Sequence, residues 1–192
     1  DLACHEGYPG HHVYNVLLEE RLVKGRGWRE FTLLPLFSPM ALIAEGTAVY
    51  ATRLAFTPAE RLAFERDVLF PLAGLDPADA TRNAEIRELL EDLRGAAVEG
   101  ARAYLDGKMT AGEVRAWSVR YGLATPERAK KTIAFTDAYR SYVVNYGYGE
   151  ELVGKYVEAR GGKDGARRWD VFVRLVCEPV LPRELVTAAK RR

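Results

Sequence analysis

The chain has no apolar run long enough to span a membrane, which takes about 18 or more uninterrupted apolar residues. We therefore predict no membrane span. Its 28 basic and 27 acidic residues almost cancel, so no net charge favours binding to nucleic acid or to an anionic membrane. Cysteine is also scarce: Cys4 and Cys177 fit neither a zinc-binding spacing nor a disulfide framework, and the sequence does not decide whether they pair.

Strand signals are missing as well, because no run alternates apolar and polar residues between hairpin turns. Signals for the start of a helix are frequent instead. They are the capping boxes at residues 57–60 and 110–113, and a capping residue followed by proline at Ser38-Pro39, Asp76-Pro77 and Thr125-Pro126. At 192 residues the chain can bury a substantial core, so we expect one all-α domain over residues 1–192.

The sequence also predicts the boundaries of two helices. The helix after the first histidines should continue through Val23 and end in the glycine-containing segment 24–27. A longer helix should run from Asp76-Pro77 to about Tyr104, with a weak point at Gly95.

All three histidines lie in one short segment, His5-Glu6-Gly7-Tyr8-Pro9-Gly10-His11-His12. Histidine is the commonest metal ligand, and a glutamate beside it is the usual general base of a zinc hydrolase. Structural histidines have no reason to gather in one place. The segment therefore predicts a metal site.

The spacing of the histidines does not fit a regular helix. The familiar zinc-hydrolase signature places its two histidines four residues apart, and Pro9 occupies that position after His5. On a regular helix His11 would point about 120° away from His5, and His12 would lie about 10 Å further along the axis. Two imidazoles that each bond one ion at about 2 Å cannot span such a gap.

Pro9 and Gly10 suggest how the chain departs from a regular helix, because proline lacks the N–H donor and glycine adopts backbone angles closed to other residues. A two-residue bulge would bring His11 to the position of the second ligand, whereas His12 would need three residues looped out. We therefore favour His11. The alternative is a helix break that the histidines merely flank.

Glu45 is the candidate third ligand. It is the only charged residue between Glu30 and Arg53, in an apolar helical segment that Ser38 should cap. A carboxylate in such a segment is costly to bury unless it is paired or bound to a cation. Gly46 would let another backbone approach closely. The alternative is a half-exposed glutamate on an amphipathic helix.

The first segment, together with Glu45-Gly46-Thr47-Ala48-Val49-Tyr50, resembles the bacterial domain of unknown function 885 family. Those proteins resemble zinc metallopeptidases of the gluzincin type and are distantly related to carboxypeptidase Taq. Thr47 stands where the family usually has tryptophan. The resemblance implies a zincin-like helical catalytic domain in which His5, His11 and Glu45 bind Zn²⁺ and Glu6 is the general base.

A third stretch, Tyr146-Gly147-Tyr148-Gly149, is similar to an element that precedes a helix in members of this family. The resemblance suggests that the Tyr146 hydroxyl stabilises the oxyanion, with Tyr142 and Tyr148 as competitors. An aromatic cluster of this kind is as often part of a core. Arg140 is a candidate for holding a substrate carboxylate, although a helical arginine is usually solvated or paired. His12 is a further candidate for the surroundings of the site.

The chain begins with Asp1, four residues before the first histidine, and a helix that carries an active site would not normally start there. Typical members of the resembled family are considerably longer on the N-terminal side. We therefore expect a C-terminal part of a larger metallopeptidase-type protein, whose N-terminal part is a candidate partner. Nothing in the sequence indicates the compartment.

These residues predict a zinc-dependent hydrolase, and the resemblance implies a metallopeptidase acting on peptide or small amide substrates. Two imidazoles and a carboxylate favour zinc, although cobalt, manganese or iron would also bind. Two alternatives remain open. One is a zinc hydrolase of a non-peptide amide or ester, and the other is a catalytically inactive helical interaction domain.

Overall fold

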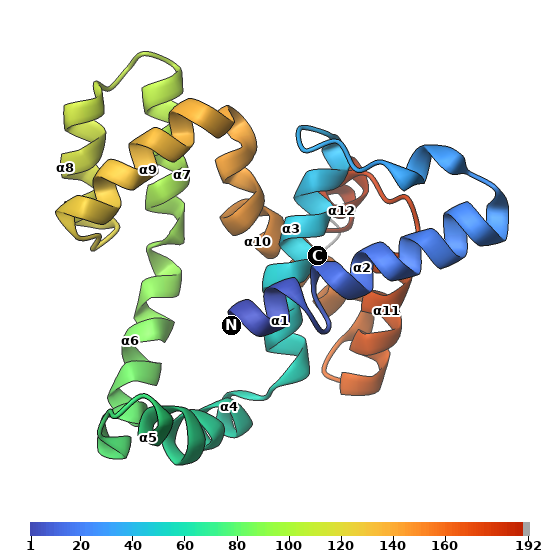
Figure 1. Ribbon diagram of the computed structural model, residues 1–192, viewed down its shortest axis with the longest axis horizontal. Helices are drawn as coiled ribbons and strands as arrows, with labels where there is room; N and C mark the ends of the chain where they lie inside the picture. The colour runs from blue at the N-terminus through green and yellow to red at the C-terminus, as the bar shows by residue number, and fades with distance from the viewer. Residues whose placement is uncertain (190–192) are drawn as a thin grey trace. The chain divides into compact units, whose positions relative to one another are not determined.

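A computed structural model of the protein describes residues 1–189, and over this range the chain forms helices and connecting segments without a strand. The prediction of an all-α fold is confirmed. The chain divides into two compact units, one formed by Asp1–Ala55 and the chain from Val144 onward, the other by Phe56–Val143 (Figure 1). Compact units need not fold separately, so the expectation of a single domain stays a prediction.

The first unit contains the ends of the chain and the histidine segment. Its elements are α1 (Leu2–Glu6), α2 (His11–Leu18), the π-helical turn η1 (Glu19–Lys24), the 3₁₀ turn η2 (Arg29–Thr32), α3 (Pro39–Ala55), α10 (Val144–Gly161), α11 (Gly165–Cys177) and α12 (Pro182–Ala189). Helices α3 and α10 form the most extensive pairing, and α11 and α12 pack against α10. The core between them includes Tyr14, Leu18, Ile43, Val153, Val157 and Phe172.

The helix boundaries in this unit follow the sequence signals closely. The helix after the histidines continues through η1 and ends before Gly27, whose φ of +72° is readily adopted only by glycine. Helix α3 begins at Pro39 as predicted. The predicted side-chain cap is wrong, however, because the buried Ser38 hydroxyl has no hydrogen-bond partner, and the Ala41 N–H donates to the Ser38 carbonyl instead.

The second unit consists of shorter helices. They are α4 (Pro58–Phe64), the π-helical turn η3 (Glu65–Leu69), α5 (Phe70–Leu72), the 3₁₀ turn η4 (Pro77–Asp79), α6 (Ala80–Asp92), α7 (Arg94–Leu105), α8 (Ala111–Tyr121), α9 (Pro126–Tyr139) and the 3₁₀ turn η5 (Arg140–Val143). Both predicted capping boxes are present, at Thr57 and at Thr110. The predicted long helix is interrupted at Leu93, two residues before Gly95, which lies inside α7.

The buried carboxylate of Glu65 organises part of this unit. Arg61 Nε donates to Glu65 Oε1 at 2.8 Å, and Arg87 Nη1 donates to the same oxygen at 2.7 Å. Burial by itself would raise the pKa of Glu65, but the two guanidinium groups outweigh burial and lower it below its ordinary value. The ion pairs therefore hold α4, η3 and α6 together around an ionised carboxylate.

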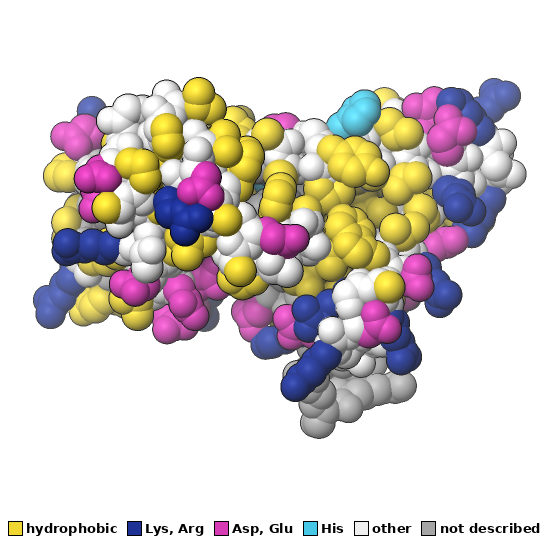
Figure 2. Space-filling model, turned by 90° about the horizontal axis from the view of Figure 1, so that it is seen from below, with side chains coloured by type: hydrophobic (Ala, Val, Ile, Leu, Met, Phe, Trp, Pro, Cys, Tyr) yellow, Lys and Arg dark blue, Asp and Glu magenta, His cyan; other side chains and the backbone are white. Residues whose placement is uncertain are grey.

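On the face drawn in Figure 2, acidic and basic side chains are mixed over the surface, in keeping with the balanced composition. No helix in the described part of the chain combines the length and apolar character that crossing a membrane requires. Cys4 and Cys177 form no disulfide, and burial raises the pKa of the Cys177 thiol.

Candidate metal centre

The histidine segment is a break between two helices. Helix α1 ends at Glu6 and α2 begins at His11, with residues 7–10 between them. The predicted two-residue bulge within one helix is therefore wrong. The physical reason lies at Gly10, where a Cβ would stand 1.9 Å from the His5 carbonyl oxygen and 2.3 Å from that of Cys4. The chain folds back against the end of α1 so tightly that only glycine fits.

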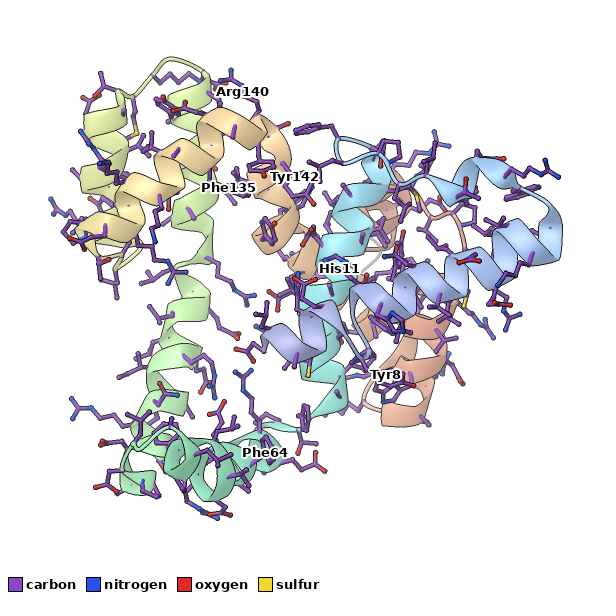
Figure 3. All side chains as sticks on the ribbon, in the orientation of Figure 1. Tyr8, His11, Phe64, Phe135, Arg140 and Tyr142 are labelled. Carbon is purple, nitrogen blue, oxygen red and sulfur yellow. The ribbon has the colours of Figure 1, made fainter. Side chains whose placement is uncertain are left out.

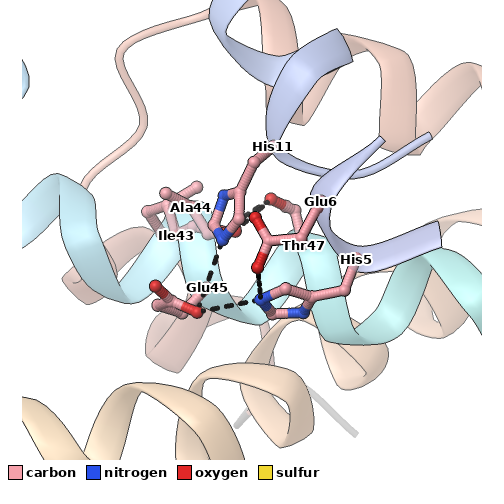
Figure 4. A network of polar contacts seen from close by, with 7 residues as sticks. All are labelled: His5, Glu6, His11, Ile43, Ala44, Glu45 and Thr47. Carbon is pink, nitrogen blue, oxygen red and sulfur yellow. Dashed lines mark hydrogen bonds and ion pairs between the residues drawn. The ribbon is translucent and has the colours of Figure 1, made fainter. Parts of the chain in front are cut away.

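The break nevertheless brings the two imidazoles together. The rings of His5 and His11 meet edge to face, with centroids 4.7 Å apart and an interplanar angle of 88°. Glu45 Oε2 lies 3.4 Å from His5 Nε2 and 3.5 Å from His11 Nε2 (Figure 4). The helix is therefore broken, as in the alternative interpretation, but the two histidines do not merely flank the break, because their side chains converge.

The two histidine–carboxylate separations suit a shared metal ion. One ligand atom from each of His5, His11 and Glu45 lies within 4.8 Å of the other two. Two ligands bonded at about 2.05 Å with a tetrahedral angle between them lie about 3.3 Å apart. The observed histidine–carboxylate distances of 3.4 and 3.5 Å are close to this value. Three protein ligands would leave one tetrahedral position for water or substrate.

Glu45 is buried, with only 7% of its surface exposed, so it is not the half-exposed glutamate of the alternative interpretation. The two imidazoles are also mostly covered, with about a fifth of each side chain exposed. The nearby Glu45 carboxylate raises the pKa of His11 above its ordinary value, against the opposing effect of burial, and the charge of Glu6 adds to it. The site therefore concentrates negative charge where a cation would bind.

Helix α3 holds Glu45 through contacts on both sides of it in the sequence. The buried Thr47 hydroxyl donates to the Ile43 carbonyl at 2.8 Å, with the Ala44 carbonyl 3.1 Å away (Figure 4). Threonine can make this bond because its hydroxyl reaches back one turn of the helix. Gly46 lies against Gly149 of α10, so the predicted close approach at this glycine is confirmed.

Glu6 lies on the accessible side of the group. Its side chain is 62% exposed, and its Oε1 is 4.0 Å from His5 Nε2. Glu6 is thus beside the same imidazole nitrogen that approaches Glu45, yet it is open to solvent. His12 is exposed and is not part of the metal-binding group.

The candidate tyrosines fall into different parts of the fold. Tyr146 and Tyr148 are on α10 of the first unit and are 39% and 43% exposed. Tyr146 precedes Gly149 by three residues, so both lie on one side of α10, the side that Gly149 turns toward α3. The assignment of Tyr146 to the oxyanion stays a prediction.

Arg140 and Tyr142 belong to the second unit, where both are on the 3₁₀ turn η5 (Figure 3). Tyr142 is buried, and its ring centroid lies 6.1 Å from that of Tyr139. Arg140 is exposed and has a φ of +53°, which is uncommon for a residue with a side chain. Their roles in the site stay predictions.

Sequence reasoning did not identify the residue that Gly46 contacts. The available signal was glycine inside a long helix, where it costs about 1 kcal/mol relative to alanine, and Gly149 shares this signal with Gly147 and Gly154. Such a cost suggests a close contact but not its partner.

Comparisons with known proteins add no assignment. No family model matches the chain, and neither a curated protein nor a solved structure matches it. The function must therefore be inferred from the chemistry of His5, His11, Glu45 and Glu6.

Proposed function

We propose that this chain is a zinc-dependent hydrolase and, most simply, a metallopeptidase. The observation that carries this proposal is the convergence of His5, His11 and Glu45, which come from three helices and place two nitrogens and one oxygen within 4.8 Å of one another. An exposed glutamate, Glu6, lies beside them. Two imidazoles, one carboxylate and an accessible base are the parts that a zinc hydrolase requires.

Each residue would have a distinct task in hydrolysis. Zinc bound by His5, His11 and Glu45 would polarise a substrate carbonyl and lower the pKa of a bound water. The Glu6 carboxylate accepts the proton of the attacking water and passes it to the leaving amine. The Tyr146 hydroxyl donates a hydrogen bond to the oxygen on which negative charge develops. The buried Glu45 carboxylate would partly balance the charge of the cation.

The proposed site residues define the class of substrate only broadly. The family resemblance implies a peptide bond, whereas the residues themselves require only a carbonyl that water can attack. A non-peptide amide or ester is therefore the alternative substrate class. A screen that compares peptides with simple amides and esters, using the zinc-loaded protein, distinguishes these classes.

One observation favours a structural role instead. Glu45 raises the pKa of His11, as expected of an ion pair that simply joins α2 to α3. In that case the chain is a helical interaction module without turnover. Metal binding separates the two proposals, because an ion pair between histidine and glutamate needs no zinc.

The test is elemental analysis of the purified chain after zinc has been supplied and the excess removed. We expect about one zinc per chain in the wild type. The variant His11→Ala should lose the metal, whereas His12→Ala, which removes the adjacent exposed imidazole, should retain it. A wild-type chain without metal would overturn the proposed function and leave the structural role.

A further inference from the structure

Helices α3 and α10 touch backbone to backbone beside the metal-binding group. A Cβ on Gly46 would lie 2.5 Å from the Gly149 carbonyl oxygen, and a Cβ on Gly149 would lie 2.9 Å from the Leu42 carbonyl oxygen. No side chain separates the helices at this crossing. The distance between them is therefore fixed by backbone atoms, which cannot yield as a flexible side chain does.

Glu45 is adjacent to this contact in the sequence. Leu42 and Gly46, the two residues of α3 whose backbones meet Gly149, stand on either side of it. Because a helix moves as a rigid rod over one turn, a displacement of α3 at Gly46 also displaces the Glu45 carboxylate. The Glu45 carboxylate faces His5 of α1 and His11 of α2.

We propose that Gly149 is a positioning residue for the metal centre. Because Gly149 has no side chain, α3 can approach α10 closely, and this approach sets the distance between Glu45 and the two histidines. This inference rests on the proposed zinc-binding function. The atoms nearest to a Cβ on Gly149 belong to the backbone of Leu42 and Gly46, so Gly149 would act through the placement of α3.

The required displacement is large for a metal site. Ordinary van der Waals contact begins at 3.4 Å, so a methyl group on Gly149, at 2.9 Å from the Leu42 oxygen, requires the backbones to separate by several tenths of an ångström. Ligand distances in metal sites are held within about 0.2 Å. The substitution Gly149→Ala therefore moves Glu45 by more than the site tolerates.

Gly154 on the same helix provides a matched control. A Cβ there would lie 3.3 and 3.4 Å from two carbons of the Tyr50 ring, so it also meets α3. This contact is with a side chain, and its distances are close to the range of ordinary van der Waals contact. The substitution Gly154→Ala thus adds the same methyl group to the same helix, facing the same neighbour, without pushing the two backbones apart.

The experiment measures the zinc dissociation constant, by competition with a chelator, for the wild type, Gly149→Ala and Gly154→Ala. We expect Gly149→Ala to weaken binding tenfold or more and Gly154→Ala to leave it within about twofold. The Co²⁺ absorption spectrum, which reports coordination geometry, should change only in Gly149→Ala. Urea unfolding of each variant gives its stability, so that a purely structural effect is recognised by lower stability with unchanged affinity and spectrum.

The outcomes separate this inference from the proposed function. A wild-type chain that binds no zinc overturns both. A wild type that binds zinc while Gly149→Ala binds it equally well overturns the role of Gly149 alone. If Gly149→Ala fails to fold, hydrogen exchange of the wild type decides: zinc should slow amide exchange more in residues 144–150 than in residues 155–161, and equal protection of the two segments overturns the inference.

Discussion

Gly10 lies so close to His5 that a Cβ on Gly10 would stand 1.9 Å from the His5 carbonyl oxygen. This contact folds the chain back after α1 and turns α2 so that His11 meets His5. The convergence of the two imidazoles therefore depends on a residue without a side chain.

The substitution Gly10→Ala should abolish zinc binding, because the chain must move away from the end of α1 and carry His11 with it. Elemental analysis of the purified variant measures this loss. Gly95→Ala is the control, since a Cβ at Gly95 meets nothing within 4 Å and should stabilise α7 by about 1 kcal/mol. Full zinc content in Gly10→Ala would show that the close contact is not needed for the site.

Glu6→Gln should retain zinc and lose turnover. The amide keeps the shape of the side chain but cannot accept a proton, so hydrolysis should slow by about 10²–10⁴-fold. Zinc content and the rate of peptide cleavage are measured on the same preparation. Glu19→Gln, which changes an exposed glutamate in η1, is the control. Unchanged turnover in Glu6→Gln would contradict its assignment as the base.

Tyr146→Phe removes only the hydroxyl that we assign to the oxyanion. We expect the variant to keep zinc and stability while its turnover falls by about 10²–10³-fold, the usual loss for one such donor. Tyr148→Phe, on the same helix and similarly exposed, should have little effect. If Tyr148→Phe or Tyr142→Phe loses turnover instead, the assignment passes to that tyrosine.

Glu65 should make the stability of the second unit depend on pH. Its pKa is lower in the fold than the ordinary value of 4.5, because Arg61 and Arg87 outweigh the effect of burial. Its carboxylate therefore stabilises the fold above about pH 4.5, and this contribution is lost as the pH falls through the lowered pKa.

The test compares urea unfolding of wild type and Glu65→Gln at neutral pH and at about pH 3. At neutral pH the variant should be less stable by about 1.5–3 kcal/mol, the range for hydrogen bonds to a charged group. The difference should shrink as the pH falls through the lowered pKa and the wild-type carboxyl takes up a proton. Glu85→Gln, an exposed change on α6, should show no difference at either pH. A constant difference across this range would contradict the electrostatic explanation.

The sequence by itself determined the fold class and several helix starts. The capping boxes at Thr57 and Thr110 each involve only four consecutive residues. They can therefore be recognised from the local sequence alone. The break after Glu6 was also signalled locally, by Pro9 and Gly10. Ser38 shows the limit of such signals, because its hydroxyl is buried without forming the expected cap.

Only the tertiary structure decided how the candidate ligands meet. The spacing of His5 and His11 allowed a bulge or a break, and the choice depended on how closely Gly10 packs against the preceding carbonyl oxygens. Whether Glu45 is buried or half-exposed depended on tertiary packing, which places His5 and His11 against its carboxylate and α10 against α3. Residue types and local spacing set the available chemistry, whereas long-range packing sets the distances at which that chemistry operates.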